Sequence, residues 1–442
     1  MARIAHLADL HVTEGPRLQD QADTLTRVVD DVVAARPDLV ILAGDLSGRT
    51  VPHRTTPQER AVLFPAVVQL AQIAPVVVVY GNHDQSPDLD GLAHLDGQWP
   101  VRVCAGAGSD VIATPSGPLG LYWLAYPVKR WLLAGQPAPG VQAAQRAVQE
   151  RLSMLCQLWG SKIKRARARH PDLCHVFAGH VQISGSRTAG GEVLAGQEIE
   201  LSRDQLDGLG VDYGALGHIH RRQEVAPRCW YSGSPWRNDY AETEPAKVWH
   251  LVDVGDWRDV PPINADGSLP EVDGVQYCGD RRPDTRVLAF DTGCRRRVTL
   301  DYRWAQPDGE DGPRWTQGPA AIDSPDTLTP GVVGADVRMR LTVPQQWAAS
   351  CPWDQEIERV RALGAHRVDM ERVIEPVLRV RAPAVAQADT LPDKLAAYWT
   401  TTATELTDQE RAAALSCLTD LQTLDDSEIN PTGDHHATDS AL

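Results

Sequence analysis

The chain has 442 residues, of which 42% are hydrophobic and 23% are charged, a composition typical of a globular protein with two or three domains. Its formal net charge of −16 argues against a protein that coats nucleic acid by bulk attraction, although a local basic surface or metal-mediated phosphate contacts remain compatible with it. No apolar run reaches membrane-spanning length and MARIAHLADLH lacks a signal-peptide pattern, so we expect a cytoplasmic protein without a membrane partner.

Short apolar runs alternate with amphipathic stretches through the first half of the chain, which is typical of strands and helices stacked in layers. Apolar residues at helical spacing predict a helix over 18–36 that ends before Pro37, which disfavours a helical residue in front of it. We expect further helices at 56–74 and 141–160, the last ending near Gly160. The runs that we predict as strands are 4–8, 38–44, 74–81, 119–127, 174–179, 211–217 and 248–254. This order predicts an α/β fold with a βαβ opening.

The first domain is predicted to span residues 1–306. It contains a stretch near 255–286 that is rich in Pro, Gly and Asp, which we interpret as an insertion. Two apolar stretches within 286–304 predict a pair of strands that close this domain. A second stretch of similar composition, 307–334, then predicts a linker to the rest of the chain.

A small separate domain is predicted at 335–385. Residues 335–344 alternate strictly between apolar and polar side chains, which is typical of a half-buried strand. A helix at 354–364 and a strand at 366–376 follow, so we predict a β-α-β arrangement.

The region 386–424 is predicted to form terminal helices. Pro392 stands at an early helical position, and Thr407 with Glu410 forms a capping-box pattern in front of regularly spaced leucines. The last residues, 425–442, are acidic and poor in apolar side chains, so we expect a disordered tail.

Polar side chains follow five of the predicted strands at the point where each strand ends, which is where open α/β proteins bind ligands. In chain order these residues are Asp9 and His11, Asp45, Asn82 and His83, His180, and His218 and His220. Side chains two apart on an extended chain project to the same side, so we expect the DxH and HxH residues to act as pairs. Carboxylate, imidazole and amide groups together suit manganese, iron or zinc, whereas an all-oxygen set would indicate magnesium or calcium.

Each of these motifs has an ordinary alternative. A Gly-His at a strand end can be a hydrogen-bonded core histidine, and GD or GNHD can be turns with solvated side chains. The presence of metal-capable groups at five successive strand ends favours a metal site over these alternatives.

The order DxH, GD, GNHD, GH, GHxH resembles that of the calcineurin-like metallophosphoesterase superfamily. The stretch VDYGALGHIH, followed by YSGSP, is similar to the SbcD-type nucleases of DNA break repair. This resemblance covers roughly residues 1–255; the module at 335–380 resembles the capping domain of these nucleases in position and pattern, and the terminal helices in position alone. The resemblance implies a four-layer α/β/β/α sandwich with a small C-terminal β-α-β capping domain and terminal helices.

The resemblance also implies two divalent metal ions, with manganese expected, that share a hydroxide as nucleophile. The implied ligands are Asp9, His11 and His220 for the first metal, Asn82, His180 and His218 for the second, and Asp45 as the bridge. His83 is implied to contact the scissile phosphate and to protonate the leaving oxygen. Asp84 is expected either to orient His83 or to cap the following helix.

The activity implied is that of a DNA exonuclease and endonuclease that hydrolyses phosphodiester bonds without a covalent intermediate, in DNA end processing and double-strand break repair. The implied partners are DNA, an SbcC-like SMC-type ATPase that binds the helices within 386–424, and a second copy of the chain in a homodimer; helices folded back on their own domain are the alternative for 386–424. A phosphodiesterase for a small molecule or nucleotide, or a non-catalytic DNA-tethering subunit, are the rival functions.

One position departs from the family pattern. Gly48 stands three residues after Asp45, where many relatives carry His or Asp to place DNA for exonuclease cutting. We therefore expect the exonuclease preference, more than metal binding, to differ in this chain. His53 lies in the same loop and is a candidate substitute, with a surface histidine as the alternative.

Two groups of basic residues are candidates for DNA contact. The densest basic run contains Lys162, Lys164 and Arg165, for which a solvated helix end is the alternative. Arg221 and Arg222 directly follow the predicted ligand His220, so they are placed to meet flanking phosphates.

Overall fold

The protein is described by a computed structural model in which the chain divides into two compact units. The first unit is Met1–Leu341 with Pro352–Arg372, and the second is Thr342–Cys351 with Val373–Leu442. The described residues are 2–48, 54–84, 88–128, 132–133, 141–188, 199–242, 246–255, 271–272, 275–276, 285–305, 314–317, 331–376, 383–388, 390–401 and 406–422. The predicted tail and most of the predicted insertion lie outside these residues; within the insertion, β14 (Glu271–Val272) pairs with β15 (Val275–Gln276).

The first sheet has six strands in the order β16-β13-β1-β2-β3-β4. Their bounds are β1 Ala2–Leu7, β2 Leu39–Leu42, β3 Val76–Val79, β4 Val101–Cys104, β13 Val248–Val254 and β16 Thr285–Asp291. Strands β1 to β4 are parallel, whereas β13 is antiparallel to both β1 and β16. Every residue of β2 and β3 is buried, as expected for parallel strands covered on both faces.

The second sheet also has six strands, in the order β11-β12-β10-β7-β6-β5. Their bounds are β5 Ala107–Thr114, β6 Gly117–Leu124, β7 His175–His180, β10 Tyr213–Gly217, β11 Gln223–Ala226 and β12 Cys229–Tyr231. The four central strands are parallel, and the edge strands β5 and β11 are antiparallel to their neighbours. A short parallel pair, β8 (Gln182–Ile183) and β9 (Glu200–Leu201), follows β7.

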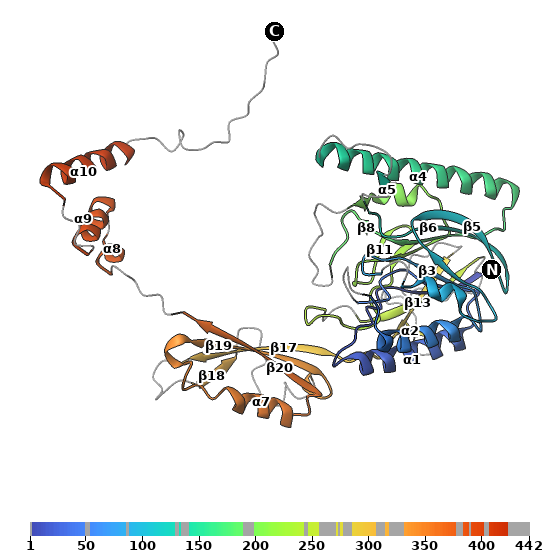
Figure 1. The fold of residues 1–442 in the computed structure, drawn as a ribbon, viewed down its shortest axis with the longest axis horizontal. Helices are drawn as coiled ribbons and strands as arrows, with labels where there is room; N and C mark the ends of the chain where they lie inside the picture. The colour runs from blue at the N-terminus through green and yellow to red at the C-terminus, as the bar shows by residue number, and fades with distance from the viewer. Residues whose placement is uncertain are drawn as a thin grey trace, which may run out of the picture. The chain divides into compact units, whose positions relative to one another are not determined.

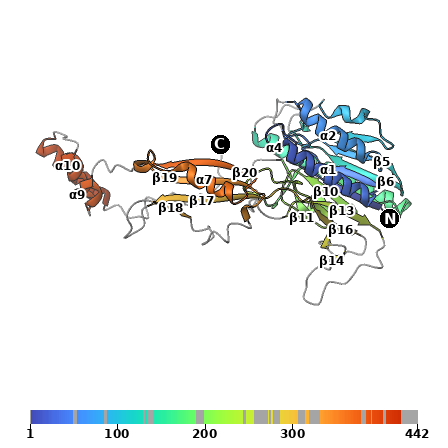
Figure 2. The same ribbon diagram turned by 90° about the horizontal axis from the view of Figure 1, so that it is seen from below.

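Helices cover both outer faces of the two sheets. Helices α1 (Leu18–Ala35) and α2 (Pro57–Leu70) pack on the first sheet, and their core also includes one face of the second sheet. Helices α4 (Val141–Arg169) and α5 (Arg203–Asp207) pack on the other face of the second sheet. Figure 1 shows α4 and α5 on one side and α1 and α2 on the other, and Figure 2 shows the face that carries α1 and α2. The predicted mixed α/β fold is therefore confirmed. A short 3₁₀ helix, η1 (Asp90–His94), precedes β4.

Helix α1 ends where the sequence predicts, whereas α2 ends at Leu70, before the predicted end at residue 74, and α4 ends later than predicted. Helix α1 ends at Ala35, and Arg36 adopts a left-handed conformation with φ 49° before the proline. The predicted end of the third helix near Gly160 is wrong, because α4 continues to Arg169. A Cβ at Gly160 would lie 2.7 Å from the Gly208 carbonyl oxygen, so this glycine allows α4 to pack closely against the end of α5.

The C-terminal module is a four-stranded sheet in the order β18-β17-β19-β20, with α7 (Trp353–Ala362) packed on one face. Its strands are β17 Arg297–Ala305, β18 Arg314–Gln317, β19 Asp336–Pro344 and β20 Arg367–Glu375. The half-buried strand predicted at 335–344 is confirmed by alternating burial, with Val337, Met339 and Leu341 inside.

The strand pair predicted within 286–304 needs a correction. Only β16 joins the first domain; β17 joins the module, where Leu300 and Tyr302 pack in its core. Part of the predicted linker also belongs to this sheet, because β18 pairs with β17. The second apolar stretch within 286–304 identified β17 as a strand but did not identify the sheet to which it belongs.

The second unit contains the 3₁₀ helix η2 (Gln345–Trp347) and three helices, α8 (Pro383–Gln387), α9 (Leu391–Thr401) and α10 (Asp408–Gln422). The predicted capping box is confirmed, since the Glu410 N–H donates to Thr407 Oγ1 at 3.3 Å and the Thr407 N–H to Glu410 Oε2 at 2.8 Å. Within the described ranges, no helix has the length and hydrophobicity needed to cross a bilayer.

A buried hydrogen-bonded chain joins the two six-stranded sheets. Arg222 Nε donates to His250 Nε2 at 3.0 Å, so the other nitrogen of His250 carries the proton and faces the Tyr213 hydroxyl at 3.4 Å. The Tyr213 hydroxyl lies 2.8 Å from His6 Nδ1, and His6 Nε2 donates to the Leu216 carbonyl at 3.2 Å. This order of donors and acceptors requires both histidines to be neutral.

We expect acid to destabilise the protein through this chain. Burial lowers the pKa of His6 from 6.5 to about 3, despite its bond to Leu216. As pH falls, His6 therefore takes up a proton in the unfolded chain before it does so in the folded protein. The free energy of unfolding decreases as pH falls below 6.5, by at most about 1.4 kcal/mol per pH unit for one histidine. Urea unfolding at several pH values checks this, and His6→Gln should flatten the dependence. Equal slopes in the two proteins would contradict it.

Candidate metal centre

The predicted ligands converge where β1, β2 and β3 of the first sheet and β7 and β10 of the second sheet have their carboxyl ends. Three groups have ligand atoms that all lie within 4.8 Å of one another: Asp9, His11 and His220; His11, Asp45 and His83; and Asp9, Asp45 and His180. Residues from both sheets therefore share one site.

Left-handed backbone conformations place several of these side chains. Asp9 and His11 have φ values of 54° and 43°, Asp45 has 52° and His218 has 100°. The explanation by strand alternation is therefore wrong, because the chain turns as soon as β1 and β10 end. Such conformations are costly for residues other than glycine and are concentrated at functional sites.

At the first metal position, formed by Asp9, His11 and His220, the electron pairs of nitrogen and oxygen atoms face one another. His11 Nε2 lies 2.9 Å from His220 Nε2, and the buried Asp9 Oδ2 has no hydrogen-bond partner among the described residues. The other ring nitrogen of His220 lies 2.8 Å from a Glu242 carboxylate oxygen, so its proton is held there and Nε2 keeps its electron pair. This donor set fits a divalent cation.

The second position is centred on Asn82 Oδ1, which lies 3.0 Å from His180 Nε2 and 3.1 Å from His218 Nδ1. His180 Nδ1 lies 2.8 Å from the Ala43 carbonyl oxygen, an acceptor, so Nδ1 is the protonated nitrogen of the neutral ring. When the ring is neutral, as cation binding requires, the unprotonated nitrogen of His180 would face the amide oxygen, an arrangement that also fits a cation.

Asp45 lies between the two positions. Its Oδ2 atom is 3.4 Å from His11 Nε2 in the first group and 3.4 Å from His180 Nε2 in the second. Its Oδ1 atom accepts the His83 backbone N–H at 2.8 Å, which fixes the carboxylate. This geometry is what a bridging ligand requires.

The electrostatics of the site favour added positive charge. Burial raises the pKa of Asp9, and burial alone would raise that of Asp45, but the adjacent His180 and His11 lower the pKa of Asp45 below its usual range. Burial opposes protonation of His180, yet Asp45 raises its pKa to about 9. A proton on His180 thus substitutes for the cation that these oxygens attract.

A carboxylate that we did not predict orients His220. Glu242 Oε1 accepts from His220 Nδ1, and Glu242 Oε2 accepts from the buried Lys247 ammonium at 2.6 Å. Burial alone would raise the pKa of Glu242, but the hydrogen bond from His220 and the Lys247 charge lower it to about 2. Carboxylate–histidine pairs of this kind orient metal ligands. The sequence offers no signal that Glu242 orients a metal ligand, because His220 lies 22 residues away in the chain.

His83 lies beside the metal-ligand cluster. Its ring stands edge-on to the His11 ring, with centroids 4.7 Å apart, and its buried Nδ1 has no hydrogen-bond partner in the part of the chain that the structure describes. The Asp84 carboxylate accepts the backbone N–H groups of Ser47 and Gly81 and so ties two loops together. Both roles expected for Asp84 stay predictions, since the residues directly after it, 85–87, lie outside the described residues. Burial and the nearby Asp45 raise the pKa of Asp84 to about 7.

Gly48 is tightly packed in this chain. A Cβ atom there would lie 1.9 Å from Thr13 Oγ1 and 2.8 Å from the His11 carbonyl oxygen. A larger residue would require Thr13 to move, so the departure from the family pattern is matched by the packing around it. His53 lies outside the described residues.

The predicted DNA-contact residues lie in different places. Lys162, Lys164 and Arg165 are on α4, and Arg167 on that helix pairs with Asp212, which directly precedes β10. This basic run therefore approaches the edge where β10 begins, and the structure does not bring it to the metal ligands, which lie where β10 ends.

Arg221 and Arg222 follow His220 and are both half-buried. Arg222 stacks over the Trp230 ring at 5.1 Å and donates to His250, so it already contributes to the core. The Arg221 carbonyl accepts from the Gln223 side chain at 3.2 Å, which fixes its backbone beside the site. A role for either arginine in DNA contact stays a prediction.

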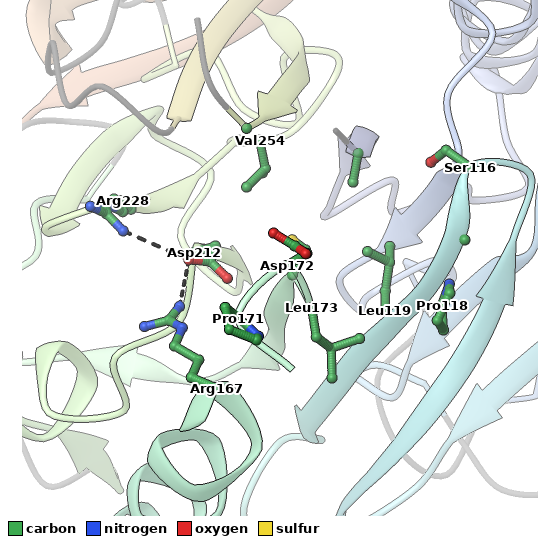
Figure 3. A pocket seen from close by; sticks show the side chains of 14 residues that line it. Ser116, Pro118, Leu119, Arg167, Pro171, Asp172, Leu173, Asp212, Arg228 and Val254 are labelled. Atoms are coloured by element: carbon green, nitrogen blue, oxygen red, sulfur yellow. Dashed lines mark hydrogen bonds and ion pairs between the residues drawn. The ribbon is translucent and has the colours of Figure 1, made fainter. Parts of the chain in front are cut away.

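A cavity of about 680 Å³ lies at the opposite edge of the sheets, where β10 begins (Figure 3). Arg167 and Arg228 point toward Asp212 from two sides, with Arg228 Nη1 3.9 Å from Asp212 Oδ1. Because β10 separates this cavity from the histidine cluster at its other end, the cavity is distinct from the candidate metal centre.

The sequence matches the family model of the calcineurin-like phosphoesterases over residues 2–222, which is half of the chain. A curated relative from Staphylococcus epidermidis, the D subunit of the nuclease SbcCD, is 23% identical over 272 residues, covering 57% of this chain and 66% of the relative. The chain thus spans slightly less than two thirds of that relative's length. The matched family range contains all eight residues that we predicted at the site.

Two solved structures are similar to parts of the chain. GAP50, the anchor in the inner membrane complex of Plasmodium, has a TM-score of 0.34 at 12% identity, with 57% of this chain and 80% of that chain covered. YfcE, a phosphoesterase from E. coli, has a TM-score of 0.23 at 11% identity, with coverage of 57% and 88%.

Adding Mn²⁺ is expected to stabilise the metal-free protein, because a cation that binds only the folded site shifts the unfolding equilibrium. The gain should be about 2.7 kcal/mol at a free metal concentration near 100 times Kd. Calorimetric melts after EDTA treatment, with and without Mn²⁺, measure it. His180→Ala should lose the part of this shift that comes from the second metal position, whereas Lys164→Ala, at an exposed residue of α4, should keep the whole shift. A melting temperature that is the same with and without Mn²⁺ would refute the metal centre.

Proposed function

Because the chain belongs to the calcineurin-like phosphoesterase family, we propose that it is a manganese-dependent DNA nuclease of the SbcD type that hydrolyses phosphodiester bonds. The observation that supports this most directly is the convergence of seven metal-capable side chains on one site, with Asp45 between two groups of donors. The weak match to the D subunit of the nuclease SbcCD supports DNA as the substrate. The proposed context is DNA end processing and double-strand break repair.

Two divalent ions at this site would neutralise charge on the phosphoryl group and make a water molecule ionise near neutral pH. The residues proposed to hold them are Asp9, His11 and His220 at the first position, Asn82, His180 and His218 at the second, and Asp45 between them. Glu242 keeps the His220 electron pair directed into the site by holding the proton of the other ring nitrogen.

His83 is proposed to act on the substrate rather than on the metals. Its backbone N–H is fixed by Asp45, and its ring lies against His11 with one nitrogen that no group of the described residues engages. This places an imidazole beside the position where a phosphate would meet the metals. It can donate to a phosphate oxygen and protonate the leaving oxygen. Because the proposed nucleophile is water rather than a side chain, the reaction would need no covalent enzyme intermediate.

DNA is proposed to pass over this edge of the two sheets, with Arg221 closest to the site in sequence. Lys162, Lys164 and Arg165 are proposed to contact DNA only at a distance from the metals. An SMC-type ATPase is proposed to bind α9 and α10, of which α10 carries the regularly spaced leucines noted above. A second copy of the chain is proposed to complete a homodimer. Gly48 supports a shift from exonuclease toward endonuclease cutting.

Replacing His83 by alanine is expected to lower cleavage by roughly 10²- to 10⁴-fold, because a proton donor is lost, while metal binding is retained. Cleavage of end-labelled linear DNA with Mn²⁺ measures the first effect, and bound Mn²⁺ per chain measures the second. His170→Ala, at the exposed end of α4, is the matched control and should cleave normally.

Near-normal cleavage by His83→Ala would reject the role of His83. Wild-type protein that hydrolyses a small phosphodiester dye but no DNA would replace the nuclease by a small-molecule phosphodiesterase. Metal-loaded protein that binds DNA and cleaves neither substrate would indicate a tethering subunit.

A further inference from the structure

The segment from Trp236 to Glu242, called the 236–242 segment below, ends at the metal centre. Glu242 is almost fully buried and accepts from His220 Nδ1 at 2.8 Å and from Lys247 Nζ at 2.6 Å. The Asn238 backbone N–H donates to the same carboxylate at 3.1 Å, and the Lys247 ammonium also donates to the His220 carbonyl at 3.1 Å. His220 is thus held at both its side chain and its backbone by Glu242 and Lys247.

The same segment is anchored on the four-stranded sheet through Tyr240. The Tyr240 ring lies against two guanidinium groups, those of Arg297 in β17 and Arg338 in β19, each 5.0 Å from its centroid. Its hydroxyl donates to Asp369 in β20 at 2.9 Å, and Asp369 in turn accepts from Arg367 at 2.8 Å. Three strands of the sheet therefore hold one side chain, through cation–π contacts and a charged hydrogen bond.

Asn238 connects the two ends of the segment. Its N–H binds the Glu242 carboxylate, and its carbonyl accepts from Arg297 Nη1 at 2.7 Å and from Arg17 Nη1 at 3.1 Å. A displacement of Arg297 with the sheet would therefore act on the backbone that binds Glu242. Tyr240 is only two residues from Glu242, so the chain between these two bound side chains is short and a displacement of one acts on the other.

We propose that the 236–242 segment couples the four-stranded sheet to the first metal position, with Tyr240 and Glu242 as positioning residues that set the orientation of His220. The inference rests on the metal centre proposed above. Its physical basis is that the buried Glu242 carboxylate is bound by the His220 ring, the Lys247 ammonium and the Asn238 backbone, so a displacement of that backbone acts on the group that orients His220. A shift of the sheet, imposed by DNA or by a partner, would then change the affinity for the first metal.

The test is Mn²⁺ binding, followed by the loss of the free-Mn²⁺ electron paramagnetic resonance signal. In an Asn82→Ala background we expect only the first metal position to bind Mn²⁺. In a His220→Ala background we expect only the second metal position to bind it. In the first background, Glu242→Gln should weaken Mn²⁺ binding by about 10- to 100-fold. Tyr240→Ala should weaken it by about 5-fold or more. Tyr240→Phe, which keeps the stacking and loses the bond to Asp369, should have a smaller effect.

Controls separate coupling from misfolding. Arg340→Gln breaks ion pairs with Glu371 and Asp301 inside the same sheet without touching the segment, and should bind Mn²⁺ normally. Tyr240→Ala should leave the second position unchanged in the His220→Ala background. Adding Tyr240→Ala to Glu242→Gln should weaken the first position little further, because both act through one path. Melting in EDTA confirms that each variant folds.

Two results would overturn the inference: unchanged first-position affinity in folded Tyr240→Ala, or additive losses when it is combined with Glu242→Gln. Wild-type protein that binds no Mn²⁺ would instead remove the proposed metal centre, and the inference with it. The failure of the coupling and the failure of the proposed function are therefore distinguished by the wild-type titration.

Discussion

The close approach of the two sheets at the carboxyl ends of their strands is the constraint on which the site depends. A Cβ at Gly217 would lie 1.9 Å from the Ala43 carbonyl oxygen, and one at Gly44 would lie 2.1 Å from His180 Nδ1. Only glycine permits such contact, and Gly44 also has a φ of 91°. Because backbone touches backbone there, ligands from five strands can reach one small volume.

Bringing the carboxylates and imidazoles of the site so close together is electrostatically unfavourable, and the protein's own charged groups do not fully compensate for it. Asp9 and Asp45 are buried within a few ångströms of one another, and the electron pairs of several imidazoles face their oxygens. Protonation of His180 supplies one positive charge, as its raised pKa indicates. Two divalent ions would satisfy the remaining acceptors, so the arrangement is explained by cation binding better than by folding stability.

The sequence predicted what is local and missed what depends on distant contacts. Each ligand motif directly follows a recognisable strand, so the candidate ligands could be named before the structure. Glu242, the Arg222 network and the membership of β17 could not, because each depends on a partner more than twenty residues away. Gly160 illustrates the same limit: a glycine that looked like a helix end is instead a contact point between α4 and α5.

The acidic composition is compatible with a DNA substrate because the bound metals, rather than the arginines near the site, would attract the reacting phosphate. Arg222 donates to His250, and Arg17 donates to carbonyls of the 236–242 segment, so neither is a simple phosphate-binding cation. The attraction for phosphate at the reacting bond would come from the bound metals instead. Charge placed there acts on the group that reacts, whereas surface lysines and arginines would attract every phosphate of a nucleic acid equally. A chain with a net charge of −16 can therefore act on DNA at one point without coating it.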